Sequence, residues 1–431
     1  MKYFSTNKQS PVVDFREATI RGQAPDRGLY FPERIQALPA GFIEGLKGKT
    51  REEIAFEVIH PYVGDSIPED QLRRIVGETV NFQFPLVKVN EDVYSLELFH
   101  GPTLAFKDVG ARFMSRCLGY FSRDRADKVH VLVATSGDTG GAVASGFYNV
   151  EGVEVVILYP SGKVSSVQEK QLTALGNNIH ALEVDGSFDD CQRMVKQAFT
   201  DRELNNKLFL TSANSINVAR WLPQQFYYFY ALQQWTEKEP PVIAVPSGNF
   251  GNLCAGLVAY RSGLPVKHFI AACNANDTVP EYFRGGEYQA KPAKATISNA
   301  MDVGDPSNFV RMLEIFDHKF GDLKEAITSY SISDDETRKT MLEVKNKFRY
   351  LPDPHGAVAY AALEKHMSQH GGEKYVFLET AHPIKFYDVV EPLINESIPL
   401  PDSVRDIMGK KKVSTRISTY YTELKDFLLH R

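Results

Sequence analysis

The residue with the clearest chemical potential is Lys107, in the segment FHGPTLAFKDVGARF at residues 99–113. Most lysines are solvated, but Lys107 follows the apolar residues Leu104, Ala105 and Phe106. Burial would disfavour its ammonium form, and a neutral amine can form a Schiff base with an aldehyde. Asp108 could instead make Lys107 one half of an ordinary ion pair, so both interpretations stay open at this point.

A glycine-containing loop at residues 247–252, with the sequence SGNFGN, could bind an anion. It falls between a run typical of a strand and a run typical of a helix. Gly248 and Gly251 would let backbone N–H groups close on the anion, and the start of a helix adds a favourable dipole. Because the loop holds no lysine or arginine, its backbone donors suit the phosphate of a cofactor that stays bound.

A second candidate anion site is the segment NSINVAR at residues 214–220. Amide, hydroxyl and guanidinium groups meet here at the expected end of a strand and start of a helix. Arg220 could hold phosphate oxygens in a fork geometry. A capped helix start followed by a surface arginine explains the same pattern equally well on spacing alone.

The elements that must position these groups follow from the alternation of short β-branched runs with helical stretches. Unbroken apolar strands separated by helices indicate a parallel sheet covered on both faces. Residues 253–260 read as a helix that stops before Gly263 and Pro265. The expected strands are residues 129–134, 153–158, 208–211, 242–245, 269–272 and 375–378.

Small, hydroxylated and amide residues recur directly after these strands, as in TSGDTGG, YPSGK, TSANS, PSGNFGN, CNAND and ETAHP. In open α/β sheets, ligands bind at the carboxyl edge of the strands. Each loop alone could consist of ordinary turn residues, but their repetition along one edge favours a binding crevice. Residues 1–80 read instead as helical segments broken by proline and glycine. We therefore predict an N-terminal domain at 1–80 and a catalytic core at 81–431, with an inner lobe at roughly 110–225.

Composition excludes several classes of protein. The chain has 431 residues and a formal net charge of −5, which gives no electrostatic reason to expect a nucleic-acid partner. No apolar run approaches the ~18 residues of a membrane span, and the opening residues MKYFSTNKQS are too polar for a signal peptide. The four cysteines lie far apart without a C-x-x-C pair, which fits a reducing cytoplasm.

Familiar motifs of other enzyme classes are missing from the sequence. There is no G-x-G-x-x-G dinucleotide fingerprint and no G-x-S-x-G hydrolase elbow. His366 and His370 could share a helix face, but no glutamate follows His366 as a zinc protease requires. We therefore expect two surface histidines and no metal site.

Taken together, these segments resemble the threonine synthase family, within the tryptophan-synthase-β-like pyridoxal-phosphate enzymes. The resemblance covers nearly the whole chain. It implies an α/β fold of type II, with two open, twisted, mainly parallel-sheet lobes and a small N-terminal domain. The segments that carry it include FREATIRGQAPDRGLYFPE, LELFHGPTLAFKD, ATSGDTGGAVA, SANSINVAR, VPSGNFGN, SNAMDVGDPSNF, DPHGAVAY and ETAHPIKF.

The resemblance also implies roles for individual residues. Lys107 would carry the aldehyde of pyridoxal 5'-phosphate, and Thr380 would place its hydroxyl near the pyridine nitrogen. Relatives usually have Asn where this chain has Asp138, facing the phenolic oxygen of the cofactor, where a carboxylate would repel a phenolate unless one of them holds a proton. The cofactor phosphate would be held by Gly248, Asn249, Phe250, Gly251 and Asn252, and the substrate phosphate by Ser136, Asn214, Ser215 and Arg220.

The activity implied is the conversion of O-phospho-L-homoserine and water to L-threonine and phosphate, the last step of threonine biosynthesis. Two other possibilities stay open. The first is another lyase of the family, either a serine/threonine dehydratase or a phosphohomoserine lyase that stops at the oxo acid. The second is a non-catalytic descendant that binds metabolites or proteins. We expect a cytoplasmic monomer or homodimer with a small-molecule substrate and with no nucleic-acid or membrane partner.

Overall fold

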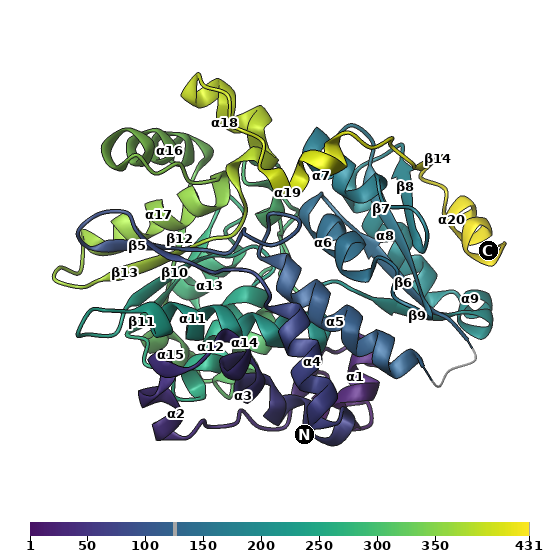
Figure 1. Ribbon diagram of the computed structural model, residues 1–431, viewed down its shortest axis with the longest axis horizontal. Coiled ribbons are helices and arrows are strands. Elements are labelled where there is room, and N and C mark those ends of the chain that lie inside the picture. Colours follow the sequence, from purple (N-terminus) through teal and green to yellow (C-terminus); the bar gives the residue numbers. More distant parts are fainter. Residues whose placement is uncertain (124–126, 431) are drawn as a thin grey trace.

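A computed structural model describes residues 1–123 and 127–430, which form three β-sheets. The largest has the strand order β12-β11-β10-β13-β5-β4, in which only β4 runs antiparallel to its neighbour. This sheet forms the left lobe in Figure 1. Its strands are β4 (Leu86–Lys88), β5 (Val93–Glu97), β10 (Val242–Pro246), β11 (His268–Cys273), β12 (Ile327–Ser331) and β13 (Tyr375–Glu379).

The second sheet forms the right lobe in Figure 1 and is parallel throughout, in the order β14-β8-β7-β6-β9. Five of the six predicted runs lie within strands of these two sheets, the sixth (208–211) overlaps β9 except for Leu208, and the predicted fold class is confirmed. The strands of the second sheet are β6 (Val129–Ala134), β7 (Val153–Pro160), β8 (Ile179–Val184), β9 (Phe209–Ser212) and β14 (Thr415–Ile417).

Both faces of the large sheet are buried because alternate residues of each strand enter different cores. In β10, Val242 and Ala244 pack in one core, while Ile243 and Val245 pack in the other. Figure 1 shows one set of helices above this sheet and another below it. These helices are α16 (Asp334–Phe348) and α17 (Pro354–Met367) above, and α11 (Gln225–Gln234), α12 (Gly251–Arg261), α13 (Thr278–Gly285), α14 (Phe309–Ile315) and α15 (Phe320–Ala326) below.

The smaller lobe is also a three-layer arrangement. Leu132 and Ala134 of β6 face a core shared with outer helices, whereas Val131 and Val133 face the central core of the molecule. The helices on the outer side are α8 (Phe188–Thr200), α9 (Arg202–Lys207) and α20 (Tyr421–Leu429). Those on the central side are α5 (Lys107–Ser122), α6 (Asp138–Phe147) and α7 (Ser166–Thr173).

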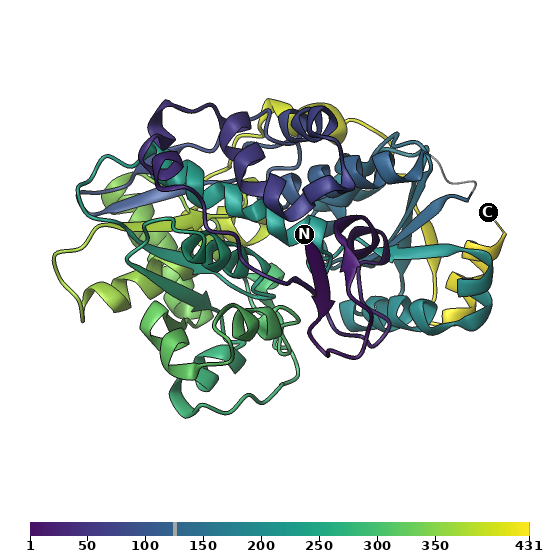
Figure 2. The same ribbon diagram turned by 90° about the horizontal axis from the view of Figure 1, so that it is seen from below.

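The N-terminal region contains a small antiparallel sheet in the order β2-β1-β3, which the sequence reading did not predict. Its strands are two to four residues long and give no recognisable period. Figure 2 shows these elements lying across the junction of the two lobes. They are β1 (Lys2–Ser5), β2 (Val13–Asp14), β3 (Tyr30–Pro32), α1 (Phe15–Arg21), α2 (Ala40–Glu44), α3 (Arg51–Val63) and α4 (Glu69–Thr79).

The C-terminal segment passes from the large lobe over the top of the molecule to the small lobe, where β14 adds an edge strand (Figure 1). On the way it forms the 3-10 helix η5 (Pro383–Phe386), α18 (Tyr387–Ile394) and α19 (Asp402–Met408). It therefore ties the two lobes together on the side opposite the N-terminal region. Within the described residues, no helix is long and apolar enough to cross a bilayer.

The prediction of two surface histidines was wrong for His366. Its side chain is buried on α17, and its ring stacks on His370 and on His268 at centroid distances of 4.3 and 5.4 Å. Burial lowers the pKa of His366 to about 4, so its ring is neutral and packs as an apolar group. No cluster of metal-binding side chains occurs in the part of the chain that the structure describes.

Candidate cofactor and substrate site

The predicted site residues converge because they follow strands of two lobes at their carboxyl ends. Lys107 is the first residue of α5, and Thr380 directly follows β13. The backbone joins them: Phe106 N–H donates to the Thr380 carbonyl at 2.9 Å, and Ala105 forms a bridge with Ala381. This pairing places the amine-bearing segment beside the end of β13, although the two are far apart in the sequence.

The surroundings of Lys107 favour a neutral amine. Burial is the main cause that lowers its pKa to about 8, with the charges of Lys385 and Arg220 adding to it and Asp138 opposing it. The N-terminal end of α5 also disfavours a cation at this position. Within the described residues, Lys107 Nζ makes no hydrogen bond or ion pair, so it is available to a ligand.

Asp108 does not pair with Lys107, so the ordinary ion-pair reading of this lysine is excluded. Its carboxylate accepts from Thr103 N–H at 2.9 Å and from Thr103 Oγ1 at 2.5 Å. Burial raises the pKa of Asp108. This side chain therefore closes the turn that precedes α5 and leaves the amine free.

The 247–252 loop has the shape of an anion cradle. Phe250 lies in the left-handed region with φ 62°, which turns the chain into α12. A Cβ on Gly248 would lie 2.5 Å from Cα of Met301, and one on Gly251 would lie 3.2 Å from Cβ of Ser215. Asn252 differs from the prediction in one respect, because its amide donates to the Pro246 carbonyl at 2.8 Å and so braces the loop.

A buried arginine that the sequence reading missed supports this cradle from behind. Arg311, on α14, donates to the carbonyls of Ser215 at 3.0 Å and Ile216 at 2.5 Å, and to Asn308 Oδ1 at 2.7 Å. Asn308 in turn donates to the Asn249 carbonyl at 2.9 Å. Arg311 gave no signal because it sits in an apolar helical run, and only the contact between distant segments reveals it.

The two predicted anion segments are direct neighbours. Asn249 Nδ2 donates to Ser215 Oγ at 2.7 Å, so a hydroxyl assigned to the substrate touches a residue assigned to the cofactor. Asn214 keeps a buried side-chain oxygen that has no partner among the described residues. The helix that follows, α10 (Val218–Trp221), is a single turn. Any anion held here depends on side chains, since so short a helix contributes little dipole.

Arg220 is buried, so the interpretation as a surface arginine was wrong. Within the described part of the chain it donates one hydrogen bond, from Nη1 to the Ala213 carbonyl, and its buried Nε has no partner. Burial lowers its pKa to about 10, which leaves the guanidinium charged at neutral pH. A buried cation with unused donors is suited to an anionic ligand.

Asp138 begins α6, with Ser136 in the turn before it and Gly137 at φ 134°. The carboxylate accepts at Oδ1 from Gln168 Nε2 at 3.0 Å and faces Lys385 Nζ at 2.8 Å. Burial alone would raise the pKa of Asp138, but the charges of Lys385 and Lys107 hold it well below its usual range. The carboxylate is therefore ionised and already neutralised by a lysine.

These residues fit a cofactor that carries both an aldehyde and a phosphate. An amine with a pKa of about 8 can condense with the aldehyde, and the glycine loop at the start of α12, where Met301 and Ser215 leave no room for larger residues at 248 and 251, can offer backbone N–H groups to the phosphate. Pyridoxal phosphate has both groups.

The family models agree with this chemistry. Residues 78–380 match the model described as pyridoxal-phosphate dependent enzyme, residues 2–80 match threonine synthase N terminus, and residues 356–428 match threonine synthase, C-terminal. The chain belongs to the threonine synthase family of pyridoxal-phosphate enzymes. Threonine synthase of Serratia marcescens is 43% identical over 431 residues, which cover 100% of this chain and 99% of that protein.

Solved structures of the threonine synthase family superpose over the full length. The enzyme from Escherichia coli is 42% identical with a TM-score of 0.93, and each chain is covered completely. The pyridoxal-phosphate-bound threonine synthase from Brucella melitensis is 35% identical with a TM-score of 0.93, covering 100% of this chain and 99% of its own. The arrangement of lobes described above is therefore shared with these two structures.

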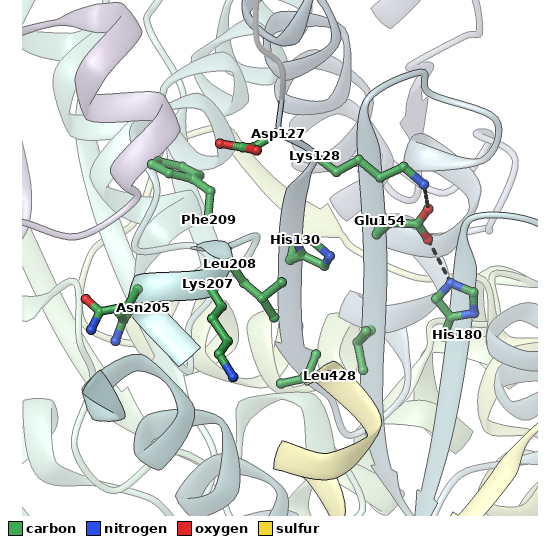
Figure 3. Close-up of a pocket in the computed structure, with 12 residues that line it drawn as sticks. Asp127, Lys128, His130, Glu154, His180, Asn205, Lys207, Leu208, Phe209 and Leu428 are labelled. Carbon is green, nitrogen blue, oxygen red and sulfur yellow. Dashed lines mark hydrogen bonds and ion pairs between the residues drawn. The ribbon is translucent and has the colours of Figure 1, made fainter. Parts of the chain in front are cut away.

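A separate hollow of about 540 Å³ lies at the other edge of the small sheet, where its strands begin (Figure 3). His130, Glu154 and His180 line it from β6, β7 and β8, and Glu154 bridges Lys128 and His180 at 2.7 and 2.8 Å. Parallel sheets bind substrates at the carboxyl edge. None of the residues predicted for the site lies in this hollow, so we do not assign the chemistry to it.

Proposed function

We propose that this chain converts O-phospho-L-homoserine and water to L-threonine and inorganic phosphate, as the last step of threonine biosynthesis. One observation carries the proposal: an amine of lowered pKa stands beside two adjoining anion segments, of which one is a backbone cradle and the other holds a buried arginine. One segment suits the phosphate of a resident cofactor. The other suits the phosphate of a substrate that is released.

The proposed residue roles follow that division. Lys107 would form the Schiff base with the cofactor aldehyde, Asp138 would lie near the phenolic oxygen, and Thr380 would lie near the pyridine nitrogen. The buried, neutral Thr380 hydroxyl provides no charge to stabilise a cationic nitrogen. The cofactor phosphate is assigned to Gly248, Asn249, Phe250, Gly251 and Asn252, and the substrate phosphate to Ser136, Asn214, Ser215 and Arg220.

When bound, pyridoxal phosphate supplies an electron-withdrawing ring that makes carbon-bound protons of the amino acid acidic. Lys107 Nζ then serves as the general base that removes protons at the α- and β-carbons of the substrate and later returns them. Its pKa of about 8 suits both directions of transfer near neutral pH. Arg220 holds the phosphate while the γ-carbon–oxygen bond breaks, and water adds at the β-carbon.

We also propose the division into an N-terminal domain at 1–80 and a catalytic core at 81–431, with the inner lobe at roughly 110–225. The separate small sheet of the first region and the grouping of β6 to β9 support this division. A monomer or homodimer in the cytoplasm, acting on O-phospho-L-homoserine, completes the proposal. The four buried, unpaired cysteines fit such a reducing compartment.

Product analysis in ¹⁸O-labelled water tests the proposed reaction. We expect equimolar threonine and phosphate from O-phospho-L-homoserine, with the label in the threonine hydroxyl. Formation of 2-oxobutyrate would instead identify a phosphohomoserine lyase, and preferential turnover of serine or threonine a dehydratase. Bound cofactor without turnover of any of these would favour a binding protein. Lys107→Ala is the matched negative control, since it removes the amine and leaves both anion segments in place.

A further inference from the structure

A second buried lysine, Lys385, lies in the site and has no role in the assignments above. It belongs to η5, and 0% of its side chain is exposed. Its Nζ lies 2.8 Å from Asp138 Oδ1 and donates to the Thr103 carbonyl at 2.7 Å. A fully buried ammonium group is costly unless it is paired, so this position needs a physical reason.

The pairing of Asp138 explains what Lys385 does. Both partners of the carboxylate, Lys385 and Gln168, contact Oδ1, and Oδ2 has no hydrogen bond among the described residues. Lys385 also reaches the Thr103 carbonyl, in the turn that leads into Lys107. The lysine thus fixes the carboxylate in one orientation and at the same time anchors the segment that bears the reactive amine.

The charges that face Lys107 come from four different elements. They are Asp138 from α6, Lys385 from η5, Arg220 from α10 and Asp353 from the start of α17. Asp353 is already held by Gly356 N–H at 2.7 Å and by His355 at 2.6 Å. Asp138 is the stronger influence of the two carboxylates on the Lys107 charge, and its charged partner is Lys385.

We propose that Lys385 is a positioning residue of this site, whose buried ammonium group neutralises and orients Asp138 so that Lys107 and the phenolic oxygen of the cofactor face an ion pair and not a lone carboxylate. The inference rests on the proposed function for the identity of the cofactor. It removes the repulsion that a lone carboxylate would exert on a phenolate. It also prevents Asp138 from capturing the Lys107 ammonium group in a pair of its own.

The proposal predicts opposite shifts for two single variants. In Lys385→Met, the unpaired Asp138 carboxylate should stabilise the Lys107 ammonium group, so its titration midpoint rises. In Asp138→Asn, Lys385 and Arg220 remain without the opposing carboxylate, so the midpoint falls. The double variant Asp138→Asn/Lys385→Met removes both charges and should return close to wild type.

Competitive acylation of the full-length apoprotein measures these midpoints directly. The extent of Lys107 modification is followed by peptide mass spectrometry across pH 6 to 10. At pH 7 we expect labelling at least ~3-fold lower in Lys385→Met and at least ~3-fold higher in Asp138→Asn, with the double variant within about 2-fold of wild type. Lys339→Met, at an exposed lysine of α16, is the control that should change nothing.

A holoprotein measurement gives a second readout, the pH midpoint of the visible absorbance of bound cofactor, which should shift with the same signs. An unchanged or lowered midpoint in Lys385→Met would overturn the proposal and leave Lys385 as a packing residue. If Lys385→Met does not fold, Asp138→Asn and the double variant decide, because adding Lys385→Met to Asp138→Asn must raise the midpoint again. Apoprotein labelling needs no substrate, so these results stand apart from the product analysis that tests the proposed reaction.

Discussion

The two anion segments touch each other, yet they are built in opposite ways. The 247–252 loop offers backbone groups at the start of an eleven-residue helix, with Phe250 in the left-handed region and no charged side chain. The 214–220 segment contains the start of a single helical turn and offers side chains. A backbone cradle suits a group that stays, because it is rigid. Side-chain donors suit a group that enters and leaves.

The two buried arginines behind these segments sharpen the same contrast. Within the described residues, Arg311 donates four hydrogen bonds, three of them to backbone carbonyls, and so braces the structure. Arg220 donates one; both arginines keep a buried Nε without a partner, so Arg220 has the larger number of unused donors. Two equally buried arginines can therefore have different roles. The number of unused donors distinguishes a structural cation from one available to a ligand.

The largest effect, on cofactor binding, is expected from Gly248→Val, which disrupts the 247–252 loop. The new Cβ would lie 2.5 Å from Cα of Met301, so the loop must move away from its backbone geometry. Loss of two charge-assisted hydrogen bonds, at ~1.5–3 kcal/mol each, predicts at least ~100-fold weaker cofactor binding. Equilibrium dialysis measures it. Gly251→Ala, which meets Ser215 at 3.2 Å, should lose much less; equal losses in the two variants would count against the cradle.

Arg220→Ala attacks the other segment and should lose at least ~10-fold in kcat/KM for O-phospho-L-homoserine, since a charge-assisted phosphate contact contributes ~1.5–3 kcal/mol. Cofactor retention should be normal, because the cradle is untouched. Steady-state kinetics and dialysis on the same preparation separate the two effects. A variant that loses cofactor and keeps its substrate preference would show that the two anion sites have been assigned the wrong way round.

A change of pH should affect cofactor capture by Lys107 and leave phosphate binding by Arg220 almost unchanged. Burial lowers the pKa of Lys107 to about 8, so its neutral fraction rises about tenfold between pH 7 and pH 9. Arg220, with a pKa lowered to about 10, stays mostly charged over this range. Cofactor capture by the apoprotein should therefore accelerate about tenfold, as followed by absorbance. Inhibition by inorganic phosphate should change less than about twofold between pH 8 and 9. A parallel change in capture rate and in phosphate inhibition would contradict the assignment of the two phosphates to separate segments.

The smallest effect is a change of opposite sign at a glycine outside both segments. Gly77 lies inside α4, and a Cβ there would meet nothing within 4 Å. Gly77→Ala should stabilise the fold by ~0.5–1 kcal/mol and leave cofactor binding unchanged. Urea unfolding measures the gain. Destabilisation by Gly77→Ala would mean that even an unobstructed glycine does not tolerate a side chain. Weaker cofactor binding in Gly248→Val would then be poor evidence for a phosphate-binding loop.

The sequence was most informative where local pattern and fold agree. The β6 run was predicted with its observed ends, and the helix over residues 253–260 lies within α12, with Gly263 at φ 105° beyond it. Strands β8 and β12 were missed because their polar residues break the apolar runs. The N-terminal sheet was missed because its three strands are only two to four residues long and show no recognisable period.

The sequence allowed site residues to be proposed on recognisable loops, but not those that act through contacts between distant segments. Lys107 and the 247–252 loop stand out by local composition. Lys385 lies in AHPIKF between apolar residues, and nothing nearby in the sequence shows that its partner is Asp138. The charge state of Asp138 was therefore an open question until η5 and α6 were seen together. Arg311 was missed for the same reason, since its partners come from three separate segments.

The central claim is that Lys107 is the residue that bonds to the cofactor, and borohydride trapping tests it most directly. The chain is loaded with pyridoxal phosphate, reduced with borohydride, digested and mapped by mass spectrometry. Lys385 is the natural competitor, because it is a second buried lysine beside the same carboxylate. We expect the reduced phosphopyridoxyl adduct on the peptide that contains Lys107 and an unmodified Lys385. An adduct on Lys385 or on any other lysine, with Lys107 unmodified, would contradict the account.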